Sequence, residues 1–241
     1  RYVLDNNFDG WCGGGGNDLG KSLFSGGIWR MEVNGSGFTP ISNFGGNSWG
    51  LGISEDFELF GCSANKNPAY HIHAPYPYFE ALGLKKEKAR RIFDFETHYP
   101  LTVTRKYDHF GSYTSAAGFD IYTARSFPKS FWNRTAFVGR PTGTLLGQFH
   151  LEPDGKGSYR GRNGGNFVAS FDEYTAPIQG RPGPDGNLYM LDWNNLIMIH
   201  GGELDNPLRD KSHGRIYRIS HKESKPDKVL NFKDAEMKTL V

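Results

Sequence analysis

Asp108 and His109 are the neighbouring side chains of this sequence best suited to acid–base chemistry. A histidine beside a carboxylate can hold a pKa near neutrality and take a proton from a substrate hydroxyl. The pair stands in the run DHFGSY (108–113), which ends with Tyr113, a candidate substrate-binding residue. The alternative is that His109 caps a turn or binds a backbone carbonyl. His109 and Asp108 are therefore candidate catalytic residues with a structural alternative.

A second run of candidate residues is FDEYTAP (171–177), which contains Asp172 and Glu173. Two carboxylates can bind sugar hydroxyls or a hard cation. Neighbouring residues on a strand point to opposite faces, however, which reduces the chance that both reach one ligand. Trp193 can stack on a sugar ring, or it can be a structural tryptophan packed between sheets. Asp172, Glu173 and Trp193 are thus candidate substrate-binding residues.

The run YHIH (70–73) places His71 and His73 on one face of a strand, a spacing that permits shared metal ligation. No third ligand at a recognisable spacing accompanies them, so a pair of surface histidines is the main alternative, and the identity of any metal stays unknown. The glycine-rich runs CGGGGND (12–18) and RGRNGGN (160–166) lack the Lys-Ser/Thr ending of a phosphate loop, and we expect both to be loops.

The elements that must position these residues are short strands. The chain has 241 residues with 32 glycines and 13 prolines, and its apolar residues come in short runs rather than helical stripes. The segment IQGRPGPDGNLYMLD (178–192) reads as a strand, an acidic turn and a second strand, which is typical of a hairpin. This pattern predicts an all-β protein.

The same unit, a turn that leads into an inner strand, recurs along the chain. The copies lie at residues 3–14, 45–63, 112–124 and 179–193, with closing strands at 26–31 and 214–219. Repeated small antiparallel sheets indicate a β-propeller, here a partial one of about four blades. The segments that lead into its inner strands should converge around one mouth of the channel, including Asn47 and Trp49.

Outside the repeats, residues 74–100 are expected to form an insert that lies outside the sheets and contains a helix at about 85–95, bracketed by prolines. The propeller domain is expected to span residues 1–219. Residues 220–230 read as a linker, and residues 231–241 as the start of a following helical domain.

Charge and composition exclude several partners. The net charge is +2, and the basic clusters at 84–91 and 221–228 are mixed with acidic residues, so we expect solvated surface and no nucleic-acid partner. No apolar run is long enough to cross a bilayer, and the first residues lack the pattern of a signal peptide, so we expect the chain to begin inside a longer protein. Cys12 and Cys62 could pair in an oxidising compartment or be two separate thiols.

Several long motifs carry a family resemblance. NSWGLGISEDFELFGCSANKNPAYHI (47–72), NFVASFDEYTAPIQGRPGPDGNLYMLDWNNLIMIH (166–200) and LRDKSHGRIYRI (208–219) resemble the propeller of large membrane-bound dehydrogenase-like proteins, a type with a haem-binding CxxCH domain that is typical of planctomycetes and verrucomicrobia. That propeller is similar to quinoprotein glucose and sorbosone dehydrogenases. The resemblance implies a six-bladed ring and a periplasmic or extracellular location. It also implies oxidation of a sugar or polyol, with PQQ and calcium as cofactors.

The resemblance also implies that electrons pass to a haem domain of the same protein or to a cytochrome. In quinoprotein sugar dehydrogenases an Arg-Asn pair holds the quinone; here Gly46 stands in place of the arginine and Asn47 is retained. A second arginine of that family corresponds to Ala176, with Arg181 nearby. Asn47, Trp49 and Arg181 are therefore the candidate cofactor-binding residues. Because a cation is missing, a non-catalytic propeller that binds glycan or protein is the alternative.

Overall fold

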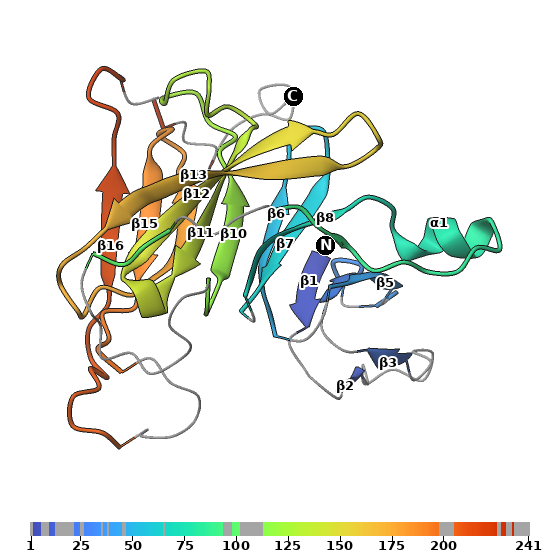
Figure 1. The fold of residues 1–241 in the computed structure, drawn as a ribbon, viewed down its shortest axis with the longest axis horizontal. Coiled ribbons are helices and arrows are strands. Elements are labelled where there is room, and N and C mark those ends of the chain that lie inside the picture. Colours follow the sequence, from blue (N-terminus) through green and yellow to red (C-terminus); the bar gives the residue numbers. More distant parts are fainter. Residues whose placement is uncertain are drawn as a thin grey trace.

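The computed structural model describes residues 2–5, 10–12, 22–24, 27–34, 36–37, 39–44, 47–64, 66–93, 98–101, 113–197, 205–225, 228–229 and 233, with side chains from residue 27 onward. These residues form four antiparallel sheets, a two-stranded hairpin and one short α-helix (Figure 1). The prediction of an all-β chain is confirmed.

The strands follow one another through the sheets in sequence order. The first sheet contains β1 (Tyr2–Asp5), β4 (Gly27–Arg30) and β5 (Thr39–Asn43), and the hairpin contains β2 (Gly10–Cys12) and β3 (Ser22–Phe24). The second sheet contains β6 (Ser48–Ile53), β7 (Leu59–Ser63), β8 (Asn67–Ile72) and β9 (Arg90–Arg91). The third contains β10 (Ala117–Ile121), β11 (Thr135–Arg140), β12 (Leu145–Pro153) and β13 (Tyr159–Ala169), and the fourth contains β14 (Pro177–Pro182), β15 (Leu188–Asp192) and β16 (Arg215–Ile219).

The four sheets are arranged as the blades of a partial β-propeller. Each sheet begins with its inner strand: β1 lies beside β6, β6 beside β10, and β10 beside β14 (Figure 1). The expected partial propeller of four blades is thus confirmed. One detail of the expectation was wrong: in the fourth sheet β14 is the inner strand, and β15, which ends at Asp192, is the second strand.

Burial along the strands follows from this packing. β7 and β11 are buried at every position, because a sheet covers each of their faces. Between the second and third sheets the core contains Phe60, Phe119 and Ile121. Between the third and fourth sheets it contains Phe137, Leu188 and Met190. Each sheet is therefore stabilised mainly by the apolar surface that it buries against its neighbours.

Hydrogen bonds identify the two ends of the sheets. At one end the Ser115 N–H donates to the carbonyl of Ala64, which follows β7, and Thr144 Oγ1 donates to the Ser170 carbonyl. At the opposite end Arg125 donates to Glu55 at 2.7 Å. We call the first end, where β6, β10 and β14 begin, the mouth end.

The segment at residues 74–100 differs from expectation. Its helix is α1 (Tyr76–Ala81), which begins directly after Pro75, and not the expected helix at about 85–95. The described residues near 85–95 instead contact two sheets: the Ala89 N–H donates to the Asn43 carbonyl at the end of β5 in the first sheet, and β9 pairs with β8 in the second. The expectation that the whole segment lies outside the sheets was therefore wrong.

A long hairpin, β12–β13, belongs to the third sheet but reaches the second. The Gly161 N–H donates to the Ile92 carbonyl at 2.5 Å. In the turn of the hairpin, Ser158 Oγ lies 3.0 Å from His71 Nδ1, while His71 Nε2 lies 3.0 Å from Glu58. The run at 160–166, expected to be a loop, forms part of β13 with two register shifts in its pairing. The run at 12–18 lies largely outside the described residues.

Two smaller expectations are settled by burial. His71 is buried and hydrogen-bonded, so it is not part of a surface pair, and His73 lies 3.4 Å from Glu87. Cys62 is a free, buried thiol, and burial raises its pKa to about 12.

No helix among the described residues is long and apolar enough to cross a membrane. The expected helix at 231–241 lies, apart from Lys233, outside the described residues.

Candidate functional site

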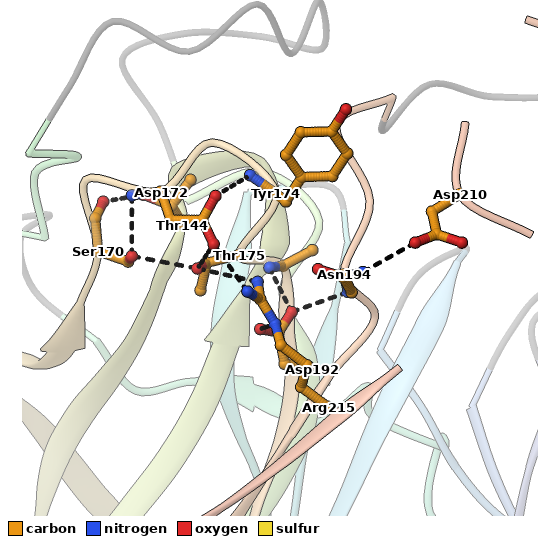
Figure 2. Close-up of polar contacts among 10 residues, drawn as sticks. Thr144, Ser170, Asp172, Tyr174, Thr175, Asp192, Asn194, Asp210 and Arg215 are labelled. Atoms are coloured by element: carbon orange, nitrogen blue, oxygen red, sulfur yellow. Dashed lines mark hydrogen bonds and ion pairs between the residues drawn. The ribbon is translucent and has the colours of Figure 1, made fainter. Parts of the chain in front are cut away.

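The mouth end of the fourth sheet carries a connected network of polar side chains. Asp192 ends β15 with a fully buried carboxylate, and Arg215 begins β16 directly opposite it in the register. Arg215 Nε donates to Asp192 Oδ2 at 2.9 Å, and Arg215 Nη1 donates to Asp172 Oδ2 at 2.7 Å. Figure 2 shows the guanidinium between the two carboxylates, with Thr175 beside it.

Two backbone N–H groups also donate hydrogen bonds to the Asp192 carboxylate. Its Oδ1 accepts from the N–H of Ala176 at 2.7 Å and from the N–H of Asn194 at 2.9 Å. Asn194, which has a positive φ of 54°, also donates from its side chain to Asp210 at 3.0 Å. The buried carboxylate therefore fixes the segment that leads into β14 to the end of β15.

The electrostatics of the network follow from these contacts. Burial alone would raise the pKa of Asp172, but hydrogen bonds from Arg215 and from the Tyr174 N–H outweigh it, so this pKa lies below its usual value. Burial would lower the pKa of Arg215, but the hydrogen bond to Asp172 and the charge of Asp192 raise it. The Asp172 carboxylate and the Arg215 guanidinium are therefore both charged at neutral pH.

Two partly exposed aromatic residues belong to the segments that form the network. Tyr174 is 37% exposed and Trp193 is 44% exposed, and the backbone N–H of Trp193 donates to the Ala176 carbonyl at 3.0 Å. Partly exposed rings beside hydrogen-bonding groups can contact an apolar face and polar edges of one ligand. Glu173 is half-buried in the same segment. The structure therefore brings Asp172, Glu173 and Trp193 into one region.

Asn47 and Trp49 lie at the mouth end of the second sheet. Asn47 precedes β6 with a positive φ of 63°, a conformation that asparagine tolerates better than most residues. Its side-chain oxygen accepts from Trp49 Nε1 at 2.5 Å, and the Trp49 ring is half exposed. These two residues share an end of the propeller with Asp172 but are in a different sheet.

Arg181 lies away from the mouth end, and Tyr113 is buried beneath it. Arg181 is near the far end of β14, where its Nε is 3.2 Å from Asp120 Oδ2, so it is separated along the strand from the mouth end. Burial raises the pKa of Asp120 to about 6 although Arg181 lowers it. Tyr113 is buried, and its hydroxyl donates to the Val138 carbonyl. Asp108 and His109 lie outside the described residues.

Sequence reasoning missed the role of Arg215 and also missed His98. His98 is buried beside Tyr113 and Phe149, and burial lowers its pKa to about 4. The signal for Arg215 was its place at the start of the closing strand, opposite Asp192 once the strands are aligned in antiparallel register. No comparable signal marks His98, because the segment around it has no strand or helix pattern.

The cofactors that the resemblance implies place a charge requirement on this site. An anionic quinone such as PQQ needs uncompensated cations, but Arg215 at the mouth end is bound by both Asp172 and Asp192. Among the described residues, no three His, Cys, Asp or Glu side chains are grouped so that they could hold a metal ion. The Asp172–Arg215–Asp192 network itself therefore does not fit an anionic quinone.

The fold and the position of the network define the chain as a partial β-propeller with a polar site at its mouth end. The chain belongs to the family described as Domain of unknown function (DUF7133), whose model matches residues 1–223. A comparison with curated proteins gives no match.

Solved structures similar to the chain include dehydrogenases. The PQQ-bound aldose sugar dehydrogenase from Streptomyces coelicolor is 15% identical, with a TM-score of 0.49 over 91% of this chain and 57% of that one. A luciferin-regenerating enzyme is 15% identical, with a TM-score of 0.47 over 88% and 58%. A glucose dehydrogenase is 17% identical, with a TM-score of 0.41 over 75% and 42%. The chain thus spans about half the length of these proteins.

Proposed function

We propose that the mouth end of this propeller binds a neutral sugar or polyol, and that the chain is the substrate-binding part of a dehydrogenase-like protein. The observation that carries the proposal is the Asp172–Arg215–Asp192 network, formed by segments that also carry the partly exposed rings of Tyr174 and Trp193. A sugar offers hydroxyl donors on its edges and an apolar C–H face, which matches carboxylates beside an aromatic ring.

Within this site the residues have distinct roles. The Asp172 carboxylate is 44% exposed and accepts from ligand hydroxyl groups. Arg215 fixes the orientation of Asp172, and the buried Asp192 holds Arg215 in place. The ring of Trp193 packs against the C–H face of the ligand. An anionic sugar is disfavoured because the two carboxylates outnumber the single guanidinium.

The resemblance adds an oxidation to this binding role. In that reading His109, supported by Asp108, takes the proton of the bound hydroxyl group. As the C=O bond forms, the C–H bond of the same carbon would break and its hydrogen would leave with both bonding electrons, as a hydride, to a quinone acceptor of the PQQ type held outside the described residues. The electrons would then pass to a haem domain of the same protein or to a cytochrome. A periplasmic or extracellular location belongs to the same reading.

A second candidate is a non-catalytic propeller that binds glycan and acts as a scaffold. The pairing of Arg215 with two carboxylates favours it, because this leaves the guanidinium without capacity for an anionic quinone. Both candidate functions require that a ligand binds at the mouth end. Only the dehydrogenase-like protein would oxidise that ligand.

Calorimetric titration of a panel of neutral sugars and polyols tests the binding. We expect Asp172→Asn and Trp193→Ala each to weaken binding about tenfold, the usual effect of losing one charge-assisted hydrogen bond or one ring contact. Glu152→Gln is the matched control, because Glu152 forms an exposed ion pair with Arg162 on the β12–β13 hairpin. Equal affinity in all variants contradicts the proposal. Binding without turnover, with quinone, calcium and an artificial electron acceptor supplied, selects the scaffold.

A further inference from the structure

The segment around α1 projects from the sheets on the side of the molecule opposite β16 (Figure 1). Its base is fixed to the propeller: the Asn43 N–H at the end of β5 donates to the Tyr76 hydroxyl at 3.1 Å, and the rings of His73 and Phe79 lie edge to face at 6.2 Å. Beyond this base, every residue from 80 to 88 is exposed. We call residues 78–88 the tip.

Apolar side chains of the tip are held in contact with water. Tyr78 is 64% exposed, Leu82 is 72% exposed and Leu84 is 57% exposed. The helix ends in a Schellman motif, in which Gly83 has a φ of +64° and the Leu84 N–H donates to the Phe79 carbonyl at 2.8 Å. Because this turn already fixes the backbone, the tip can bury its apolar groups against a partner with little further cost of ordering.

The same tip carries an excess of positive charge. Residues 76–91 contain five lysine and arginine residues and two glutamates, so their net charge is +3. Both glutamates already have a basic partner, at 2.5 and 3.4 Å. Within the part of the chain that the structure describes, Lys85 and Lys88 form no ion pair. Their charges are therefore available to an anionic partner beside the exposed apolar groups.

Charge and apolar exposure together select the kind of partner. Composition alone predicts solvated surface for the basic run at 84–91, but the structure places three exposed apolar side chains beside it. A nucleic acid offers phosphates without an apolar layer for these side chains. An anionic phospholipid surface offers phosphates at its headgroups and hydrocarbon directly beneath them. A projecting tip can also reach a flat lipid surface without obstruction by the sheets.

We propose that the tip docks the protein on an anionic phospholipid surface. Leu82 and Leu84 enter the boundary between headgroups and acyl chains, and the Tyr78 ring lies at the level of the headgroups. Lys85 and Lys88 contact the lipid phosphates. This binding is peripheral, and it is independent of the sugar site proposed in the fourth sheet.

Sedimentation with vesicles of phosphatidylglycerol and phosphatidylcholine tests the docking. We expect binding that weakens as salt is added and is at least about tenfold weaker on phosphatidylcholine alone. Lys85→Gln combined with Lys88→Gln should weaken binding about twentyfold, and Leu82→Ser about tenfold. The matched controls are Lys129→Gln and Leu208→Ser, which change an exposed lysine and an exposed leucine outside the tip and should bind as the wild type does.

A second readout separates insertion from adsorption by charge. Leu82→Trp adds a fluorophore to the tip, and phospholipids with brominated acyl chains should quench the added emission. The proposal is overturned if the anionic vesicles do not bind, a result that would leave an acidic protein as the occupant. It is equally overturned if Leu82→Ser binds as the wild type does, if brominated lipid leaves the added emission unchanged, or if double-stranded DNA at equal phosphate displaces the vesicles.

Discussion

At the scale of single residues, Arg215 joins three separate parts of the mouth end. It connects the loop before β14 through Asp172, the end of β15 through Asp192, and its own strand β16. An arginine can do this because its planar guanidinium offers five donors in fixed directions. The fully buried carboxylate of Asp192 depends on it for charge compensation.

Replacement of Arg215 by leucine should therefore lower the free energy of unfolding by about 2–4 kcal/mol, because it leaves Asp192 buried with no cation. Urea unfolding measures the loss. The control is Arg162→Leu, which breaks an exposed pair with Glu152 and should cost no more than about 0.5–1 kcal/mol. Similar losses in the two variants would show that the network does not depend on Arg215.

His98 gives a prediction about pH. Burial lowers its pKa from 6.5 to about 4, so the folded protein binds fewer protons than the unfolded chain between these values. The contribution of neutral His98 to the free energy of unfolding is complete above pH 6.5. It is lost as the pH falls toward 4, and the loss is about 3 kcal/mol in all. The difference in unfolding free energy between wild type and His98→Gln, measured from pH 7 to pH 4, should shrink accordingly. A difference that is constant with pH would show that His98 is not the group responsible.

His109 carries the catalytic expectation, which rests on the proposed oxidation. His109→Asn keeps hydrogen-bonding capacity but removes the titratable base, so turnover by the full-length protein should fall about hundredfold or more. The assay uses a panel of sugars and an artificial electron acceptor. If turnover persists unchanged in the variant, His109 is a structural residue and the base lies elsewhere.

At the scale of elements, the hairpins were predictable and the helix was not. The Pro-Asp-Gly turn between β14 and β15 defines its own geometry: the Gly183 N–H donates to the Asn187 carbonyl, and Asp185 accepts from the Asn187 N–H. Residues near 85–95 have helix-favouring composition, but Ala89 and Ile92 are buried against the sheets, and tertiary packing outweighs local propensity there.

The mouth-end network was predictable only in part. Asp172, Glu173 and Trp193 stood out by residue type, and the turn that brings them together was visible in the sequence. Arg215 is 23 residues after Asp192, and only the pairing of β15 with β16 brings the two together. Contacts of this kind depend on strand register, which a single sequence specifies weakly when the intervening loop is long.

Gly118 lies where the inner strands β10 and β14 approach each other closely. It has a φ of +63°, and an added Cβ would collide with the backbone of Ile178 and Gln179 on β14. Gly118→Ala should lower the unfolding free energy by more than about 3 kcal/mol, because strain and overlap add. Gly155 has a φ of +72° with open space around it. Gly155→Ala should therefore lower the unfolding free energy only by the cost of the positive φ, about 1 kcal/mol. Equal losses in a thermal unfolding series would mean that the strands can separate at no cost.

At the scale of the whole molecule, burial is uneven across the propeller. β7 and β11 are buried along their full length, whereas β16 is partly or fully exposed at every position, and Ile216 is 69% exposed. The sheet that ends the described fold therefore has less apolar packing to hold its outer strand.

Amide hydrogen exchange followed by mass spectrometry should reveal this difference. We expect peptides that cover β7 and β11 to exchange at least about tenfold more slowly than peptides that cover β16, because local opening of an edge strand exposes little buried surface. Uniform protection across the three strands would indicate that a further surface covers β16 in solution.

The reach of the β12–β13 hairpin into the second sheet affects cooperativity. In a protein built from repeats, units that touch only through their faces can unfold one at a time. Here the hairpin adds the Gly161–Ile92 hydrogen bond and the Glu58–His71–Ser158 chain across the boundary, so opening the second sheet also breaks contacts made by the third. The second and third sheets should consequently behave as a single folding unit, larger than any one repeat.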